Sequence, residues 1–152
     1  MADVVDAQTR SRMMSGIRGK NTLPEIVVRR LLHGEGLRFR LHDRLLPGKP
    51  DIVLPRWKAV VFVHGCFWHG HSCPLFREPS TRKEFWGAKI MRNREIDTNA
   101  AVALKRSGWR IGIVWECALK GRQKQSTPAL AAALASWVRG NSGDIEFTGR
   151  PQ

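Results

Sequence analysis

The chain has 152 residues, 42% hydrophobic and 26% charged, which is typical of one globular domain and excludes intrinsic disorder. No apolar run is long enough for a membrane span, the start lacks the pattern of a secretory signal, and we expect a cytoplasmic protein. Lysine and arginine total 26 against 13 aspartates and glutamates, and this net charge of +13 is distributed along the chain. Such a surface attracts polyanions, of which nucleic acid is the commonest.

A first helix is predicted after an N-terminal arm that spans residues 1–20. Thr22 and Glu25 fit a capping box, in which each residue satisfies a free backbone amide of the other. Pro24 suits the first helical turn, and Gly34 ends the helix.

The remaining pattern predicts strands and two more helices. The run at 57–64 is almost wholly apolar, which is typical of a strand buried on both faces. The predicted strands cover 37–41, 51–54, 57–64 and 109–116, and the predicted helices cover 81–106, with a break near 91–93, and 127–139. This order predicts an α/β fold, a small mixed central sheet flanked by helices, in a domain of residues 21–140 with a C-terminal tail at 141–152.

Metal-ligand residues are concentrated in the irregular segment after residue 64. Cys66, His71 and Cys73 are spaced so that a loop could wrap around one zinc ion, and Cys117 could supply the fourth ligand if its strand neighbours strand 57–64. Four such ligands leave no open position, so the site would be structural. The alternative is that the cysteines are small buried hydrophobic residues and the histidines lie on the surface. Three cysteines, an odd number, argue against a disulfide framework.

A single acidic residue opens the strand at 51–54. Asp51 could hold a magnesium ion against phosphate oxygens, although an aspartate after proline is more commonly a turn cap. Many nucleases place Glu-x-Lys on the next strand, whereas this chain offers a main-chain carbonyl at Val63 and the imidazole of His64. His64 and His69 are not needed for zinc and are available for acid–base chemistry.

Large aromatic residues accompany these polar groups. Phe67 and Trp68 lie inside the same loop, and Trp86 lies in a basic helix, so they are either part of a core or wedges for a nucleic acid. Lys89 and Asn93 are four residues apart and share a helix face. Both residue types contact base edges or phosphates, but a solvated helix face would look the same.

Taken together, these motifs closely resemble the very short patch repair (Vsr) endonucleases, from residue 1 to about residue 140. The matching segments are Thr9 to Arg12, Met14, Leu46 to Gly48, Pro50-Asp51, Phe62 to His69, His71 with Cys73, Thr81 to Trp86, Gly108 to Arg110 and Val114 to Leu119.

The resemblance implies a restriction-endonuclease-like fold and a magnesium-dependent hydrolase that nicks duplex DNA on the 5′ side of the mismatched thymine at T:G mispairs. Such mispairs arise when 5-methylcytosine deaminates, and the nick initiates very short patch repair. Carried over, Asp51 is the Mg²⁺ ligand beside the carbonyl of Val63, His69 is the base for the attacking water, His64 supports the same centre, and Glu25 is an accessory acid.

The resemblance also assigns the remaining residues. Cys66, His71, Cys73 and Cys117 become the structural Zn²⁺ site; Phe67, Trp68 and Trp86 become a major-groove wedge; Met14 enters the DNA from the arm; and Lys89 and Asn93 read the mispair. The implied enzyme is a monomer with a functional link to a cytosine-5 DNA methyltransferase and to mismatch-repair proteins. The chain departs from the family pattern at Val63, where a known member of the family has Thr, and at Gly70, which replaces one histidine of a longer run.

Two other functions fit part of the sequence. A zinc-stabilised DNA-binding module needs the basic surface and the zinc ligands but neither Asp51 nor His69. A nuclease of the same fold with broad substrate choice needs the catalytic residues but no mispair recognition. Magnesium-dependent nicking separates the first alternative from the Vsr activity, and a comparison of T:G with other duplexes separates the second.

Overall fold

The computed structural model describes residues 22–77 and 79–150. The predicted N-terminal arm, including Met14, lies outside these described residues. In the described part, no helix has both the length and the apolar content that crossing a membrane requires.

A five-stranded mixed sheet forms the centre of the molecule, with the strands in the order β1-β2-β3-β4-β5. The strands are β1 (Arg40–Leu41), β2 (Ile52–Leu54), β3 (Ala59–His64), β4 (Arg110–Trp115) and β5 (Ile145–Phe147). The first three strands pair antiparallel, whereas β3 with β4 and β4 with β5 pair parallel. The expected mixed α/β architecture is therefore confirmed.

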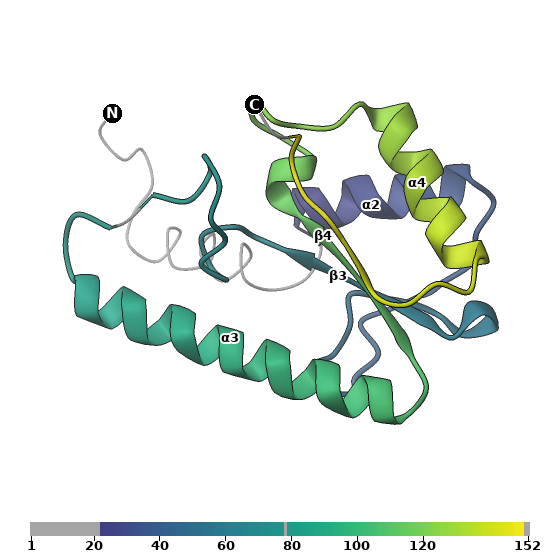
Figure 1. Cartoon of the computed structure of the whole chain (residues 1–152), viewed down its shortest axis with the longest axis horizontal. Coiled ribbons are helices and arrows are strands. Elements are labelled where there is room, and N and C mark those ends of the chain that lie inside the picture. The colour runs from purple at the N-terminus through teal and green to yellow at the C-terminus, as the bar shows by residue number, and fades with distance from the viewer. Residues whose placement is uncertain (1–21, 78, 151–152) are drawn as a thin grey trace.

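Helices cover both faces of this sheet (Figure 1). Helices α2 (Leu23–Gly34) and α4 (Thr127–Arg139) lie together on one face, and the long helix α3 (Lys83–Arg106) lies on the other. Successive side chains of a strand point to opposite faces. Val61 accordingly joins the core under α2 and α4, while Val60 packs with Leu104 of α3, so β3 is buried on both faces as its composition predicted.

The parallel pairing of β3 with β4 determines where the functional residues meet. His64, the last residue of β3, is in register with Trp115, the last residue of β4. Both strands end at the same edge, so the irregular loop after His64 lies beside the short 3-10 helix Glu116–Ala118 that follows β4. Cys117 is thus brought to the loop that holds the other candidate zinc ligands.

The helix boundaries follow the sequence signals at the start of α2. The Oγ1 atom of Thr22 accepts a hydrogen bond from the backbone amide of Glu25 at 3.4 Å, and Pro24 lies in the first turn, as predicted. The Glu25 carboxylate is only 2% exposed and pairs with Arg29 and His42.

Helix α3 is continuous, so the predicted break near residues 91–93 is wrong. The residues at 91–93 do not interrupt a helix, because neither proline nor glycine occurs between Gly87 and the end of the helix at Arg106. The first predicted strand, 37–41, is reduced to Arg40–Leu41. The strand predicted from residue 57 begins at Ala59, because Pro55–Trp57 form a 3-10 turn.

The structure also differs from the expected C-terminal tail at 141–152. Ile145–Phe147 form β5, which pairs with β4. Phe147 is buried in the core, and the indole nitrogen of Trp115 donates to Glu146 at 2.6 Å. A three-residue strand is too short to give a recognisable alternation of apolar and polar residues, so only the neighbouring strand reveals it.

Candidate active site and metal centre

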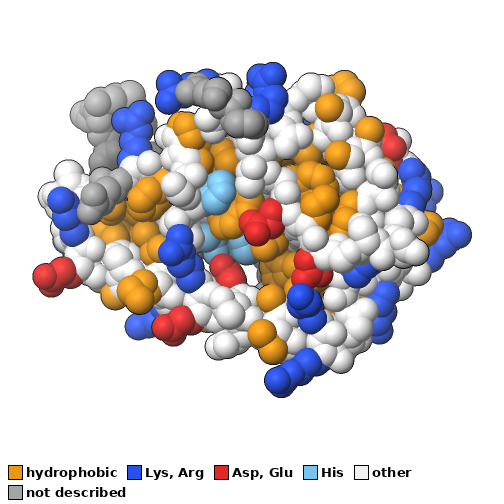
Figure 2. All heavy atoms as spheres, viewed as in Figure 1, with side chains coloured by type: hydrophobic (Ala, Val, Ile, Leu, Met, Phe, Trp, Pro, Cys, Tyr) orange, Lys and Arg blue, Asp and Glu red, His pale blue; other side chains and the backbone are white. Residues whose placement is uncertain are grey.

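A cavity of about 1450 Å³ opens on one face of the molecule. Its walls come from the start of α2, the segment before β2, the end of β3, the loop that follows β3, and α3. Figure 2 shows histidine and acidic side chains in the middle of this face, with hydrophobic side chains around them and lysines and arginines toward the edges. The cavity therefore combines ionisable groups at its centre with apolar walls.

Two carboxylates and an imidazole occupy one side of the cavity. The Asp51 carboxylate accepts a hydrogen bond from the backbone amide of Val63 at 2.7 Å. The Oε2 atom of Glu25 lies 2.9 Å from both the Nη2 of Arg29 and the Nε2 of His42. One ligand atom from each of Glu25, His42 and Asp51 lies within 4.8 Å of the others, an arrangement that could hold a metal ion.

The electrostatics of this side disfavour an unpaired negative charge on Asp51. Burial raises the pKa of Asp51 to about 7, the amide of Val63 opposes the rise, and the nearby charge of Glu25 adds to it. A divalent cation between the carboxylates would reverse this penalty, because it supplies the positive charge that the buried groups lack.

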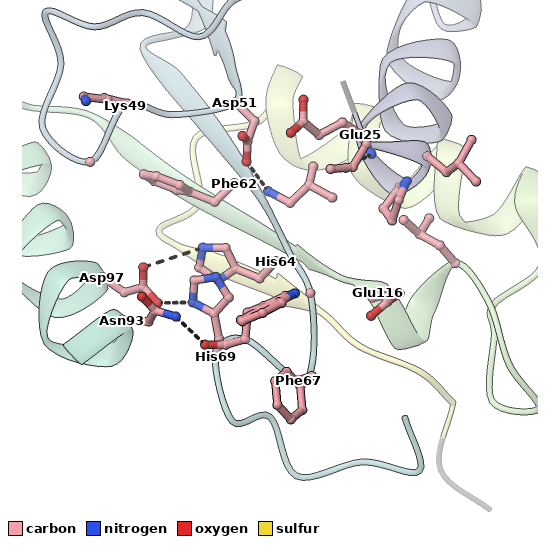
Figure 3. A pocket seen from close by; sticks show the side chains of 18 of the residues that line it. Glu25, Lys49, Asp51, Phe62, His64, Phe67, His69, Asn93, Asp97 and Glu116 are labelled. Carbon is pink, nitrogen blue, oxygen red and sulfur yellow. Dashed lines mark hydrogen bonds and ion pairs between the residues drawn. The ribbon is translucent and has the colours of Figure 1, made fainter. Parts of the chain in front are cut away.

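Two stacked histidines and an aspartate occupy the other side (Figure 3). The imidazole rings of His64 and His69 have centroids 3.8 Å apart and an interplanar angle of 7°. Asp97, on α3, accepts from the Nδ1 of His69 at 2.5 Å, and its other oxygen lies 3.9 Å from the Nε2 of His64. Because Nδ1 of His69 carries the proton that Asp97 accepts, Nε2 is left with a lone pair for accepting another proton.

Burial keeps His64 neutral. The pKa of His64 is lowered to about 3 by burial, with a further contribution from the neighbouring His69, and only Asp97 opposes the shift. Within the described part of the chain, Nδ1 of His64 has no hydrogen-bond partner. The His64 ring therefore stacks on His69 without carrying a charge of its own.

The four predicted zinc ligands converge. One ligand atom from each of Cys66, His71, Cys73 and Cys117 lies within 4.8 Å of the others. The Sγ of Cys117 lies 3.6 Å from the Nδ1 of His71, and none of the three cysteines forms a disulfide. Burial raises the pKa of the thiols of Cys66 and Cys117 and lowers that of His71. The donor set of three sulfurs and one imidazole is one that zinc binds in structural sites.

The predicted aromatic residues form a cluster beside the cavity. The rings of Phe67 and Trp68 are 5.1 Å apart between centroids, and each lies 5.6 Å from the ring of Trp86. Phe67 and Trp68 line the cavity, and all three side chains are half-buried. None of the three belongs to the cores on either side of the sheet, although helix periodicity alone would have placed Trp86 in a core.

Lys89 and Asn93 face the same loop. The Nδ2 of Asn93 donates to the carbonyl of Trp68 at 2.7 Å, and the Nζ of Lys89 lies 5.9 Å from the centroid of the Trp68 ring. Both side chains line the cavity. The α3 face that carries them is therefore directed at the loop and the cavity.

The sequence analysis missed two residues of this site. Asp97 is four residues after Asn93 and so shares its helix face, a signal that could have identified it once Asn93 was singled out. His42 gave no such signal, because it lies outside every motif and reaches Glu25 only through the fold. It also has a φ of 49°, a left-handed conformation that is uncommon outside glycine.

Comparison with known proteins agrees with this geometry. The sequence model of the family described as DNA mismatch endonuclease Vsr matches residues 2–75. The DNA mismatch endonuclease Vsr of Escherichia coli K12 is 47% identical over 147 residues, which are 97% of this chain and 94% of that protein. The type II nicking enzyme V.XorIIP of Xanthomonas oryzae is 49% identical over 119 residues, 78% of this chain and 88% of the relative. V.HpaIIP of Haemophilus parainfluenzae, another type II nicking enzyme, is 31% identical and covers 91% of this chain.

The pocket chemistry and these relatives define the class of the protein as a strand-nicking DNA endonuclease. The chain belongs to the DNA mismatch endonuclease Vsr family.

Proposed function

We propose that this protein nicks duplex DNA at T:G mispairs, on the 5′ side of the mismatched thymine, with magnesium as the catalytic cation and a restriction-endonuclease-like fold. The observation that carries the proposal is a single cavity with carboxylates on one side and a histidine–aspartate pair on the other. Phosphodiester hydrolysis needs both, because a cation must bind phosphate oxygens and a base must take a proton from water.

The carboxylate side would hold the magnesium ion. Asp51 supplies the ligand oxygen, with the carbonyl of Val63 and the carboxylate of Glu25 as neighbours, and oxygen is the ligand atom that magnesium prefers. The cation supplies charge stabilisation at the phosphate and favours ionisation of a bound water. The Val63 amide orients Asp51, which fixes one carboxylate oxygen before any ion binds.

His69 would act as the general base. Its Nε2 accepts the proton of the attacking water, and Asp97 holds the ring in the required tautomer and stabilises the imidazolium that forms. His64 supports the ring by stacking on it, and its own neutrality avoids a competing positive charge. These roles explain why both histidines and Asp97 occur together.

The zinc ion would be structural. All four ligands come from the protein, which leaves no position for water or substrate. The ligands Cys66 and His71 lie on either side of Phe67, Trp68 and His69 in the chain. Zinc would therefore hold in place the loop that carries both the aromatic cluster and the base.

Mispair selectivity would come from the aromatic cluster. Phe67, Trp68 and Trp86 would insert at a base step, with Met14 of the arm, while Lys89 and Asn93 contact the mispair. A mispair lowers the free-energy cost of opening the step, so wedge insertion favours T:G over paired duplex. The enzyme would act as a monomer, since one chain supplies every described site residue. It would act beside a cytosine-5 methyltransferase and mismatch-repair proteins.

The decisive experiment measures strand cleavage of labelled duplexes that differ only in one base pair. A T:G duplex should be nicked 5′ of the thymine with magnesium and left intact without it, while paired duplex and other mismatches react much more slowly. Equal cleavage of all duplexes would instead support the broad-specificity nuclease. Binding without cleavage under every metal condition would support the DNA-binding module.

A further inference from the structure

Two neighbouring side chains of α3 bind three successive backbone carbonyls of the loop that follows β3. Asn93 donates to the carbonyl of Trp68 at 2.7 Å. The guanidinium of Arg94 donates twice, from Nε to the carbonyl of His69 at 3.0 Å and from Nη2 to the carbonyl of Gly70 at 2.6 Å. The backbone on both sides of the proposed base is therefore attached to one turn of a helix.

These carbonyls are distinct from the ones that the loop uses for its own turns. The amides of His69 and His71 donate to the carbonyls of Gly65 and Cys66, at 3.3 and 2.8 Å. The carbonyls of His69 and Gly70 are instead bound by Arg94. A planar guanidinium can donate from two nitrogens at once in a fixed geometry, which an ammonium group cannot reproduce.

The absence of a side chain at Gly70 allows Arg94 to approach the loop backbone. Its φ of 61° lies in the left-handed region. A Cβ atom there would lie 2.7 Å from Cγ2 of Ile90 and 3.3 Å from both Nε and Nη2 of Arg94. The guanidinium and Ile90 thus occupy the space into which a side chain at residue 70 would project. This gives a physical reason for glycine at residue 70.

We infer that Arg94 is a positioning residue of the nicking reaction, which acts by fixing the His69–Gly70 backbone against α3. The same face of α3 carries Asp97, which binds the ring of His69, so ring and backbone are held by one rigid element. The backbone that Arg94 fixes runs from Trp68 of the aromatic cluster to the zinc ligand His71. The role of His69 in this inference rests on the proposed function, whereas the attachment of the loop does not.

The test compares Arg94→Ala with Arg92→Ala in the full-length, zinc-loaded protein. Arg92 is exposed on the same helix, so its replacement removes the same charge without touching the loop. Hydrogen exchange followed by mass spectrometry reports on the amides of residues 69–71. We expect these amides to exchange about tenfold faster or more in Arg94→Ala and at the wild-type rate in Arg92→Ala, because only the former frees the loop backbone.

Nicking kinetics supply the second measurement. Under single-turnover conditions with saturating T:G duplex, Arg94→Ala should slow cleavage by about 10- to 100-fold, since misplacement of a base costs rate and not binding. Its Kd for DNA should rise no more than that of Arg92→Ala, because phosphate attraction falls equally in both. Arg94→Lys, which offers one donor group, should recover only part of the rate.

The outcomes separate the two proposals. If loop exchange and cleavage rate in Arg94→Ala equal those of Arg92→Ala, the positioning role is wrong. If Arg94→Ala unfolds, the Arg94→Lys protein decides by the same two measurements, and wild-type values in both would overturn the inference. If the wild-type protein fails to nick T:G duplex, the proposed function fails, but the exchange experiment still tests whether Arg94 holds the loop.

Discussion

At the scale of single residues, the cavity contains buried ionisable groups whose neutral forms the fold favours. Burial raises the pKa of Asp51 to about 7 and lowers that of His64 to about 3. A core built for stability alone would have apolar residues at such positions. The cost is consistent with groups kept for binding a cation and for handling a proton.

Replacing Asp51 by asparagine should separate catalysis from stability. The variant should lose magnesium-dependent nicking, because the charge that binds the cation is gone, yet keep its affinity for T:G duplex. A carboxylate whose folded pKa exceeds its unfolded value destabilises the fold increasingly as pH rises through the folded value. At about pH 8 without magnesium, the free energy of unfolding of Asp51→Asn should therefore exceed that of the wild type by roughly 1–4 kcal/mol.

Nicking assays, DNA-binding titrations and urea unfolding measure these three properties. Wild-type nicking by Asp51→Asn would show that the cation is bound elsewhere. If Asp51→Asn is instead less stable than the wild type at about pH 8, the charged Asp51 carboxylate is stabilised in the fold more than its raised pKa implies.

His64 should make the protein sensitive to acid. Its folded pKa of about 3 lies below the usual histidine pKa of 6.5, so the unfolded chain takes up a proton first and stability is lost as pH falls below about 6.5. Between about pH 7.5 and pH 5 the contribution of His64 should fall by roughly 2 kcal/mol. His64→Gln should lack this part of the pH dependence.

Urea unfolding of wild type and His64→Gln at both pH values measures this difference. Titrating residues that do not contact His64 contribute equally to both proteins and cancel, so the difference reports on His64 together with its neighbours His69 and Asp97. Parallel pH dependence in the two proteins would contradict the burial effect on His64.

At the scale of elements, the loop from Gly65 to Phe76 packs on the end of β4 through a small cluster that joins Cys66, Cys73 and Leu75 to Trp115 and Cys117. On one side it carries three of the four residues that could hold a metal ion, and on the other its carbonyls are bound by α3. Metal binding and folding are linked in such loops, because the ligands converge only in the folded state.

Replacing Cys117 by alanine should therefore destabilise the protein. Elemental analysis should give about one zinc ion per wild-type chain and much less in the variant, and the melting temperature of the variant should fall by tens of degrees, since structural zinc contributes about 10 kcal/mol in small peptides. Asp51→Asn is the control, because it should keep its zinc. A folded, active wild-type protein without zinc would contradict the structural role.

Trp68→Ala tests the aromatic cluster as a wedge. The variant should bind T:G duplex about 10- to 100-fold more weakly, since stacking contributes about 1–3 kcal/mol per base. Binding to paired duplex should be almost unchanged, because phosphate contacts and salt determine it. The melting temperature should change little, because the ring is half-buried and outside both main cores.

Fluorescence anisotropy with the two duplexes and a thermal melt distinguish the alternatives. Equal weakening on both duplexes together with a lower melting temperature would assign Trp68 to the core.

At the scale of the whole molecule, the last strand supports the functional edge of the sheet. The amide of Ile111 in β4 donates to Asp144 at 2.9 Å, Trp115 donates to Glu146, and the amide of Gly149 donates to the sulfur of Cys117 at 3.3 Å. The C-terminal segment is thus connected both to β4 and to Cys117, the proposed fourth zinc ligand.

Deletion of residues 144–152 should consequently reduce the stability of the whole domain and not only remove its C-terminal segment. Loss of the β5 pairing and of buried Phe147, worth about 2–3 kcal/mol by itself, should lower the free energy of unfolding and weaken zinc retention. Wild-type stability and zinc content after this deletion would show that β5 is dispensable.

Much of this architecture could be predicted from local signals. The cap at Thr22, the apolar run of β3 and the amphipathic pattern of residues 127–139 depend on neighbours within a few residues, so the sequence by itself determined them. The convergence of the cysteine and histidine cluster was predictable for a related reason, because Cys66, His71 and Cys73 lie within eight residues and the chain has only one other cysteine, Cys117.

Only the tertiary structure decided the contacts between distant segments. It brought Asp97 to His69, His42 to Glu25 and Arg94 to the loop carbonyls. It also made a strand of Ile145–Phe147. The physical reason is common to all of them, because strand pairing and the packing of α2 and α3 bring together residues that have no periodic relation along the chain.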